Sequence, residues 1–156
     1  MPLEIERKFL VVSDDYKSQA FTSQRIKQGY LSSQAERTVR IRIVDEKAFL
    51  TIKGVSNESG TSRYEWEKKI SKADAEELLL LCEPGIIDKR RFKIKSEQFI
   101  FEVDEFFGAN EGLVIAEIEL NSENDIFQKP VWLGEEVTGI DKYYNSMLIK
   151  RPYTSW

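Results

Sequence analysis

Carboxylate and ammonium side chains occupy every second position near the start of the chain. Residues 3–10 read Leu-Glu-Ile-Glu-Arg-Lys-Phe-Leu, so Glu4, Glu6 and Lys8 share one face of an extended segment. This period of two predicts a β-strand, because successive side chains of a strand point to opposite faces. The other face is apolar except for Arg7. On an ordinary half-buried strand the charged face would meet water, so a functional interpretation requires other strands to repeat the pattern.

Further segments do repeat it, with acids or bases two positions apart. Acidic pairs recur at Glu65 and Glu67, Glu102 and Asp104, and Glu117 and Glu119, while basic residues recur at Arg25 and Lys27, Arg40 and Arg42, Lys53, and Lys89 and Arg91. Short polar residues would serve equally well on faces that meet water, yet long charged side chains dominate. Burying them in a dry interior would cost several kcal/mol for each unpaired ion. The pattern therefore predicts a wet or ligand-filled interior, with a solvated outer face as the alternative.

These two sets of charges together indicate a particular ligand. Clustered Arg and Lys side chains bind polyanions, and Arg suits bidentate contacts with phosphate. Carboxylates in the same cavity would repel a polyanion unless divalent cations lay between them. The combination predicts a polyphosphate bound with Mg²⁺ or Mn²⁺, and such a metal would support hydrolysis. The sequence contains no Walker-type loop, so strand side chains are expected to hold the phosphates.

Composition excludes several other kinds of chemistry. The 156 residues predict one domain, 1–156, and a net charge of −4 gives no reason to expect nucleic-acid binding. The absence of His excludes Ser-His and Cys-His catalysis and imidazole metal sites. The single Cys82 excludes an internal disulfide and is expected to be buried in an apolar helix face. Since no apolar run of ~18 residues and no leader pattern occurs, we expect a cytoplasmic protein without a membrane partner.

The remaining pattern consists of short strands in hairpin order with few helices. Strands are expected at residues 3–10, 25–31, 38–44, 49–53, 63–70, 87–95, 98–106 and 113–120. About eight antiparallel strands suit a closed barrel, with an open sheet or a sandwich as the alternative. Helices are expected at 13–20, 73–82, 122–127 and 141–150, a mobile hairpin tip at 54–62 and a turn at 130–134. The fold class is therefore mainly β (α+β).

Several of these segments occur in the order found in one known family. They are Glu4-Ile5-Glu6-Arg7-Lys8, residues 27–31, 40–42, 51–53, 64–67, 101–104, 116–119 and 134–138, and then Lys142 and Tyr143. Over nearly its whole length the chain resembles CYTH domains, also called triphosphate tunnel metalloenzymes. The resemblance implies a closed eight-stranded antiparallel tunnel that binds triphosphate and a divalent metal. It also implies a C-terminal helix that plugs one end.

The resemblance also implies roles for individual residues. It assigns metal binding to Glu4, Glu6, Glu117 and Glu119, and assigns Glu65, Glu67 and Asp104 either to a second ion or to holding the basic residues. It assigns the phosphates to Lys27, Arg40, Arg42, Lys53, Lys89, Arg91 and Lys142, and it places Lys8, with Glu4 and Glu6, at the attacked phosphate. Three points stay open. Lys8 could either steer the attacking water or stabilise charge, and the sequence does not say whether it acts as a base. Lys142 could instead be a solvated helix residue, and a slip of one position would exchange Lys89 and Arg91 for Arg90.

The leading functional hypothesis is hydrolysis of inorganic triphosphate, or of organic triphosphates more broadly. A class IV adenylate cyclase shares the tunnel and metal site and is the second hypothesis, because no residue here is committed to a purine. Thiamine triphosphatase is third. A non-catalytic polyphosphate-binding module is the alternative from another class, although simple anion binding does not need so many carboxylates. Apolar residues near the C-terminus, including Tyr153 and Trp156, make a homodimer a further hypothesis.

Overall fold

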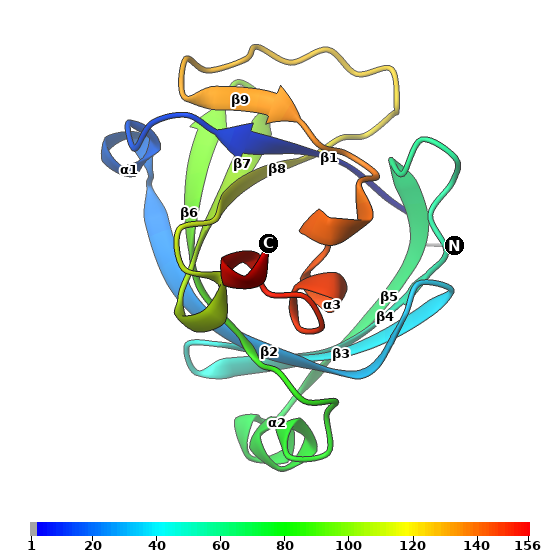
Figure 1. Cartoon of the computed structure of the whole chain (residues 1–156). Coiled ribbons are helices and arrows are strands. Elements are labelled where there is room, and N and C mark those ends of the chain that lie inside the picture. Colours follow the sequence, from blue (N-terminus) through cyan, green and yellow to red (C-terminus); the bar gives the residue numbers. More distant parts are fainter. Residues whose placement is uncertain (1–2) are drawn as a thin grey trace.

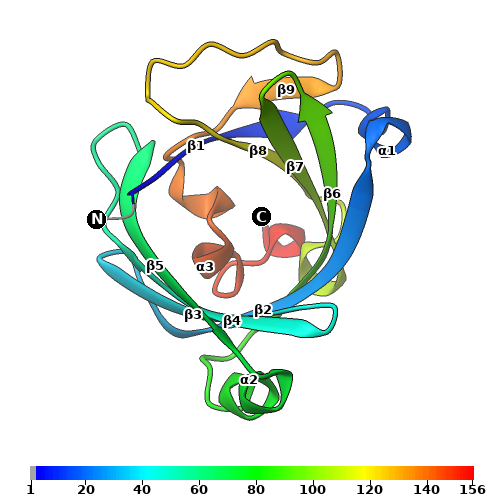
Figure 2. The same ribbon diagram turned by 180° about the vertical axis from the view of Figure 1, so that it is seen from behind.

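The computed structural model describes residues 3–156 and contains an antiparallel sheet that closes on itself (Figures 1 and 2). The strands are β1 (Leu3–Val11), β2 (Thr22–Gln34), β3 (Arg37–Val44), β4 (Lys47–Gly54), β5 (Ser62–Ile70), β6 (Ile87–Ser96), β7 (Phe99–Phe106), β8 (Val114–Glu119) and β9 (Leu133–Glu136). Their order is β5-β4-β3-β2-β6-β7-β8-β1-β9, and pairing of β1 with β5 closes an eight-stranded barrel. The predicted fold class is confirmed.

Strand β1 joins three parts of the sheet. Its first residues pair with β5, its last residues pair with the added strand β9, and its other edge pairs with β8. In the register with β8, Glu6 lies opposite Glu119 and Lys8 lies opposite Glu117. The next pair along the sheet sets Glu102 of β7 opposite Glu117. Acids from three neighbouring strands are thereby brought onto one wall of the barrel.

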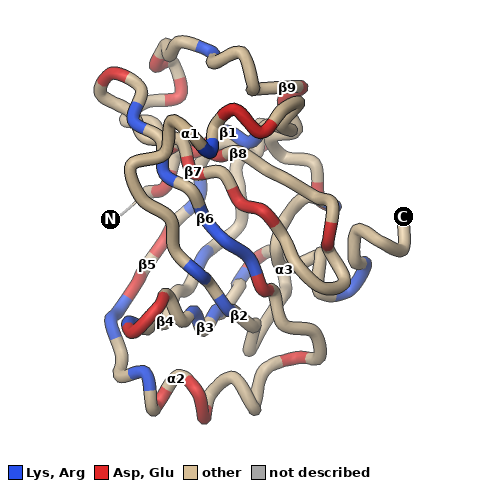
Figure 3. The backbone as a smooth tube through the Cα atoms, turned by 90° about the vertical axis from the view of Figure 1, so that its left-hand side faces the viewer, with Lys and Arg blue, Asp and Glu red and all other residues tan. Residues whose placement is uncertain are grey.

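The main apolar contacts lie outside the barrel. Phe9, Phe101 and Ile118 pack with Trp132 beneath β9 and beside the short helix α1 (Tyr16–Gln19). Because strand side chains alternate, the opposite faces of the same strands point inward and carry the charges. Figure 3 shows basic and acidic positions distributed along the strands, with a basic run on β6.

A helix covers another part of the outer face. Helix α2 (Lys72–Leu79) begins at Ser71, whose side chain accepts a hydrogen bond from the backbone N of Asp74 at 3.0 Å. Just after its C-terminal end, Cys82 packs on Gly29 of β2, where an added Cβ would be 3.0 Å from the Cβ of Cys82. A small residue on β2 therefore allows this close contact, and Cys82 is partly buried there, as an apolar filler would be.

The C-terminal segment lies across one end of the barrel (Figure 1). The expected helix 141–150 is wrong in detail, because it is divided into η2 (Asp141–Tyr143) and α3 (Asn145–Leu148). The break lies at Tyr144, whose backbone is extended between them with φ −72° and ψ 137°. We call residues 141–148 the plug. Leu148 anchors it, fully buried beside Ile87 and Ile115. Two further single turns are η1 (Gly108–Asn110) and η3 (Tyr153–Ser155).

One other expectation for the last third of the chain is wrong. Residues 122–127 are not helical, because the Asp125 carboxylate accepts hydrogen bonds from the backbone N atoms of Asn121 and Ser122 and forms a tight turn instead. The expected turn at 130–134 is present, since the backbone N of Leu133 donates to the Pro130 carbonyl oxygen at 3.1 Å, and the unexpected ninth strand begins at Leu133. Of the helices described between residues 3 and 156, none is long and apolar enough to cross a membrane.

Candidate active site in the tunnel

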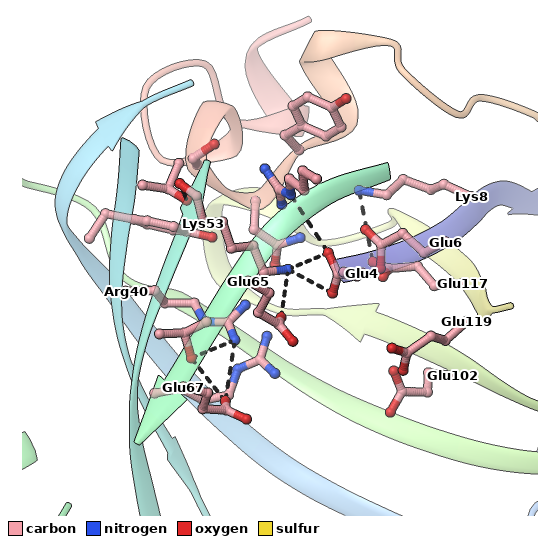
Figure 4. A pocket seen from close by; sticks show the side chains of 18 of the residues that line it. Glu4, Glu6, Lys8, Arg40, Lys53, Glu65, Glu67, Glu102, Glu117 and Glu119 are labelled. Atoms are coloured by element: carbon pink, nitrogen blue, oxygen red, sulfur yellow. Dashed lines mark hydrogen bonds and ion pairs between the residues drawn. The ribbon is translucent and has the colours of Figure 1, made fainter. Parts of the chain in front are cut away.

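A cavity of about 230 Å³ lies inside the barrel and is lined by both kinds of charge (Figure 4). Its charged lining residues are Glu4, Glu6, Lys8, Arg40, Arg42, Lys53, Arg63, Glu65, Glu67, Lys89, Arg91, Glu102, Glu117 and Glu119. These include every site residue expected from the sequence except Lys27, Asp104 and Lys142. The strand alternation thus brings charged side chains from seven strands, β1 and β3–β8, to one place.

The two ends of the cavity differ. At one end Tyr144, Asn145 and Ser146 of the plug form the wall. At the other, the cavity continues into a second hollow of about 450 Å³ near the β3–β4 turn, where Val44 and Phe49 contribute apolar surface. Arg42, Glu67, Arg91 and Glu102 line both spaces. The charged cavity is therefore covered by the plug at one end and continues into the second hollow at the other.

The carboxylates of Glu4, Glu6, Glu102, Glu117 and Glu119, which we call the acidic wall, lie close enough together to change one another's pKa values. Burial, together with Glu117 and Glu4, raises the pKa of Glu6 to about 8. Burial and the same kind of repulsion, from Glu4 and Glu102, raise the pKa of Glu119. Burial also acts to raise the pKa of Glu117, but Lys8 and Arg91 outweigh it and hold that pKa well below its usual value. A cation placed among these carboxylates would relieve their repulsion.

The chemistry of these donors fits a hard divalent cation. All are carboxylates, and Figure 4 shows Glu4, Glu6, Glu117 and Glu119 facing the same space. Within residues 3–156, no group of three or more Asp, Glu, Cys or His side chains is arranged so that it could hold a metal ion by itself. Such an open set suits a cation that binds through one or two carboxylates and completes its shell with water and phosphate oxygens.

Basic side chains on the facing strands are held by these acids. Lys53 Nζ donates to both oxygens of Glu4, at 2.9 and 3.0 Å, and lies 3.5 Å from Glu65. Arg63 Nε lies 3.6 Å from Glu4. Desolvation acts to raise the pKa of Glu4, but the charge and hydrogen bonds of Lys53 lower it overall, so Glu4 is ionised. One carboxylate thereby joins the acidic wall to two cations.

Asp104 serves the basic residues and does not line the cavity. Arg91 makes two hydrogen bonds to its carboxylate, at 2.7 and 2.9 Å, and Lys89 Nζ lies 2.8 Å away. Asp104 is only 1% exposed, so the three charges form a buried cluster behind the cavity wall. Of the two roles expected for Asp104, its contacts are those of a residue that holds basic side chains.

Two arginines have donors without protein acceptors. Arg40 donates from Nη2 to Thr51 at 3.2 Å, but its buried Nε has no hydrogen-bond partner among residues 3–156. Arg42 donates from Nε to Gln28 at 2.7 Å. Burial, followed by the charges of Arg40 and Arg91, lowers the pKa of Arg42 to about 9. Arg40 and Arg42 belong to the side of the cavity that we call the basic wall. Their positive charge is not fully compensated by the protein, which favours an anionic ligand.

Lys8 lies where the acidic wall meets the plug. Its Nζ donates to the carbonyl oxygen of Tyr143 at 3.3 Å, lies 3.8 Å from Glu117 and is 4.9 Å from the Tyr144 ring centre. Its backbone N donates to Thr138 Oγ1 at 2.9 Å, which fixes this part of β1. The plug therefore helps to position the Lys8 ammonium.

Two residues assigned to the phosphates are placed elsewhere. Lys27 is exposed on the outer face of β2 opposite Asp88, because the inward positions of that strand are Ile26, Gln28 and Tyr30. Lys142 is also exposed, with its Nζ 4.5 Å from the ring centre of Trp156, in agreement with the solvated alternative. Both expected placements in the cavity are wrong.

The structure settles the alternative register on β6. Lys89 and Arg91 point inward, whereas Arg90 contacts Ser23 on the outside, 3.3 Å away. Sequence reasoning assigned no individual role to Glu102, although it was expected on the charged face, and it did not indicate Arg63, Tyr144 or Asn145 as site residues. Arg63 could have been found because it lies two positions from Glu65. The plug residues carry no such periodic signal.

Comparison with known proteins gives consistent matches over most of the chain. Residues 2–151 match the CYTH domain. A protein from Acetivibrio thermocellus, named inorganic triphosphatase, is 49% identical over 157 residues, covering 100% of this chain and 99% of that protein. A second protein of that name, from Nitrosomonas europaea, is 34% identical over 149 residues, covering 93% and 95%.

Solved structures give the same result. The crystal structure of an inorganic triphosphatase superposes with a TM-score of 0.66 at 32% identity and covers 94% of this chain and 97% of that one. A putative adenylyl cyclase from Hippeastrum, described as having a dominant triphosphatase activity, gives a TM-score of 0.60 at 17% identity, covering 76% and 80%. At that identity the likeness concerns the fold alone. The family match over residues 2–151 and the two relatives above 30% identity show that this chain belongs to the CYTH domain family.

Proposed function

We propose that this protein hydrolyses inorganic triphosphate to pyrophosphate and phosphate, with Mg²⁺ or Mn²⁺ as its metal. The observation that carries the proposal is the division of one cavity into a wall of crowded carboxylates and a wall of cations with unused donors. A triphosphate with a divalent cation satisfies both walls at once. The two relatives named inorganic triphosphatase support the same substrate.

The basic wall binds the phosphates. Arg40, Arg42 and Arg91 offer planar guanidinium groups that match pairs of phosphate oxygens, and Lys89 adds a point charge beside them. Arg63 and Lys53 extend this wall toward the acids. Because most of these cations are anchored by protein carboxylates, they hold the anion in one orientation and lose little side-chain freedom when it binds.

The acidic wall holds the metal. Glu4, Glu6, Glu117 and Glu119 are its ligands, directly or through water. A divalent cation bound there would polarise a phosphoryl oxygen and neutralise charge that develops during cleavage. Glu65 and Glu67 hold a second ion or, as their contacts with Lys53 and Arg40 favour, keep the basic residues in place.

Lys8 acts at the plug end of the triphosphate. Its ammonium is the cation placed between the acidic wall and Tyr143 of the plug. It stabilises negative charge on the phosphoryl group bound there, and its contact with the Tyr143 carbonyl keeps it pointed into the cavity. Glu4 and Glu6, which share its face of β1, complete the catalytic group.

The test is phosphate release from inorganic triphosphate, ATP and thiamine triphosphate, each with Mg²⁺ or Mn²⁺, beside an assay for cyclic AMP. We expect fast release from inorganic triphosphate and slower release from the two organic substrates. Cyclic AMP with pyrophosphate would favour the cyclase instead. Binding of triphosphate without turnover of any substrate would make the protein a binding module.

A further inference from the structure

One side chain of the plug connects two strands of the basic wall. Asn145 Oδ1 accepts a hydrogen bond from Lys89 Nζ at 2.9 Å and another from Gln28 Nε2 at 3.1 Å. Gln28 Oε1 in turn accepts from Arg42 Nε at 2.7 Å. A continuous series of hydrogen bonds, which we call the amide relay, therefore runs from Lys89 on β6 through Asn145 and Gln28 to Arg42 on β3.

The chemistry of its two ends fixes the orientation of the amide relay. Lys and Arg side chains only donate hydrogen bonds. Asn145 must therefore present its oxygen to Lys89, and Gln28 must present its oxygen to Arg42. The Gln28 amino group is left to donate to Asn145 and, at 3.4 Å, to the Tyr30 hydroxyl. Gln28 and Lys89 are fully buried, so water does not compete for the Gln28 amide or the Lys89 ammonium.

This orientation matters for Arg42. Because its guanidinium is planar, a bond that fixes Nε also fixes the directions of both Nη groups. Neither Nη makes a hydrogen bond or ion pair with any residue between 3 and 156, although Arg42 lines the cavity. Lys89 is held in a similar way, between Asn145 and Asp104. The directions of the Arg42 and Lys89 side chains thus both depend on the side-chain amide of Asn145.

We propose that Asn145 is a positioning residue for the substrate anion, acting through the amide relay to direct Arg42 and Lys89 into the cavity. The proposal rests on the proposed function, with inorganic triphosphate as the ligand. It gives the plug a role beyond covering one end of the barrel. Asn145 holds the phosphate-binding residues in place and leaves contact with the phosphates to them.

The test replaces Asn145 by Leu, which has a similar volume and no acceptor. Three quantities are measured: the Kd for inorganic triphosphate by calorimetry with all metal chelated, and kcat and KM with Mg²⁺. Because Arg42 and Lys89 bind the anion before the reaction, we expect Kd and KM to rise about tenfold while kcat changes less than about twofold. Unchanged Kd and KM in Asn145→Leu would overturn the proposal.

Leu148→Ala is the matched control on the same short helix. Leu148 is fully buried among apolar residues outside the cavity, so its loss loosens the plug but removes no hydrogen bond of the relay. We expect a lower Tm with the wild-type Kd. An equal rise in Kd in both variants would show that packing of the plug, and not the Asn145 oxygen, sets the site.

Gln28→Leu tests the same relay from β2, including the case in which Asn145→Leu does not fold. We expect Kd to rise as in Asn145→Leu, and the double variant to bind less weakly than the product of the two single effects. Multiplicative effects would overturn the connection through Gln28.

If the wild-type protein neither binds nor hydrolyses triphosphate, the proposed function is wrong and this inference falls with it. Wild-type binding that Asn145→Leu leaves intact would overturn the inference alone.

Discussion

Glu4 is the residue in which the two walls of the cavity meet, since it faces the other acids and accepts two hydrogen bonds from Lys53. We predict that Glu4→Gln lowers kcat for triphosphate at least about 100-fold, because a proposed metal ligand becomes neutral. Metal-free binding of triphosphate should be unchanged or tighter, because one negative charge is removed from the cavity. Phosphate release and calorimetry measure the two effects.

Glu135→Gln is the control for this change, because Glu135 is exposed on β9 and does not line the cavity. It should hydrolyse and bind triphosphate like the wild type. A parallel loss of turnover and binding in Glu4→Gln would contradict the division of labour between the two walls.

Asp104 is expected to matter for stability. Desolvation acts to raise its pKa, but Arg91 and Lys89 outweigh that effect and lower the pKa from 3.8 to about 2. Asp104→Asn leaves both cations buried with a neutral partner, so we predict a loss of about 3 kcal/mol in the free energy of unfolding. Urea unfolding at neutral pH measures it. A loss below about 0.5 kcal/mol would mean that the cations find other partners.

The same carboxylate predicts a pH dependence. Its folded pKa lies below its unfolded value, so the unfolded chain binds the additional proton and stability rises with pH. The contribution of Asp104 is complete above about pH 4 and is lost as the pH falls toward 2. In Asp104→Asn, the slope of unfolding free energy against pH should become shallower between pH 4 and 2. An unchanged slope would assign acid unfolding to other carboxylates.

Single residues also show what the sequence could and could not specify. Alternation correctly separates the two faces of each strand, which is why Glu4, Lys53 and Glu117 line the cavity as expected. Alternation does not say which face is the inner one. On β2 the pattern predicts that the cations point inward, but Lys27 faces solvent, and the neutral Gln28 is buried. The choice depends on neighbours distant in sequence, such as Asp88 outside and Arg42 inside.

At the scale of elements, the β4–β5 hairpin tip is held against the segment between β9 and the plug. Gly60 has φ +75°, and an added Cβ would lie 2.4 Å from the Cα of Gly139. We predict that Gly60→Ala lowers the free energy of unfolding by about 2 kcal/mol, through backbone strain and this clash. Gly54→Ala is the matched control, because its Cβ would make an ordinary contact at 3.6 Å with Tyr64. Equal urea midpoints for the two variants would contradict the close contact.

Element boundaries follow the sequence where a pattern is long and fail where it is short. The eight barrel strands and α2 were expected within a few residues of their observed bounds, because each carries several periods of its pattern. Strand β9 has four residues, Leu133–Glu136, too few to show alternation, and it exists because the edge of β1 is available. The break at Tyr144 likewise follows from docking of the plug, where Leu148 and Asn145 contact different parts of the barrel.

For the whole molecule, a filled cavity should raise stability. Ligands that bind only the folded state stabilise it, and triphosphate at about 100 times its Kd should add about 2.7 kcal/mol, or about 5–10 °C in Tm. Thermal unfolding with chelated metal measures this rise. Arg42→Ala should reduce the rise, whereas Lys27→Ala should keep it, because Lys27 lies outside the tunnel. A reduced rise in Lys27→Ala would contradict the outward placement of that residue.

Closure of the barrel by β1 also has a consequence for protein synthesis. This strand is translated before the other eight, yet its partners β8 and β9 lie more than a hundred residues later, at 114–119 and 133–136. At roughly 5–20 residues per second, β1 waits several seconds for these partners. Until then the edge of β1 that pairs with β8 is unpaired, although β5 is available earlier for Leu3–Ile5 on the other edge, and chaperones or neighbouring nascent chains have access to the unpaired edge. Glu4 and Glu6 are thus translated well before the other acids of the cavity, and they meet Glu117 and Glu119 only after more than a hundred further residues have been made.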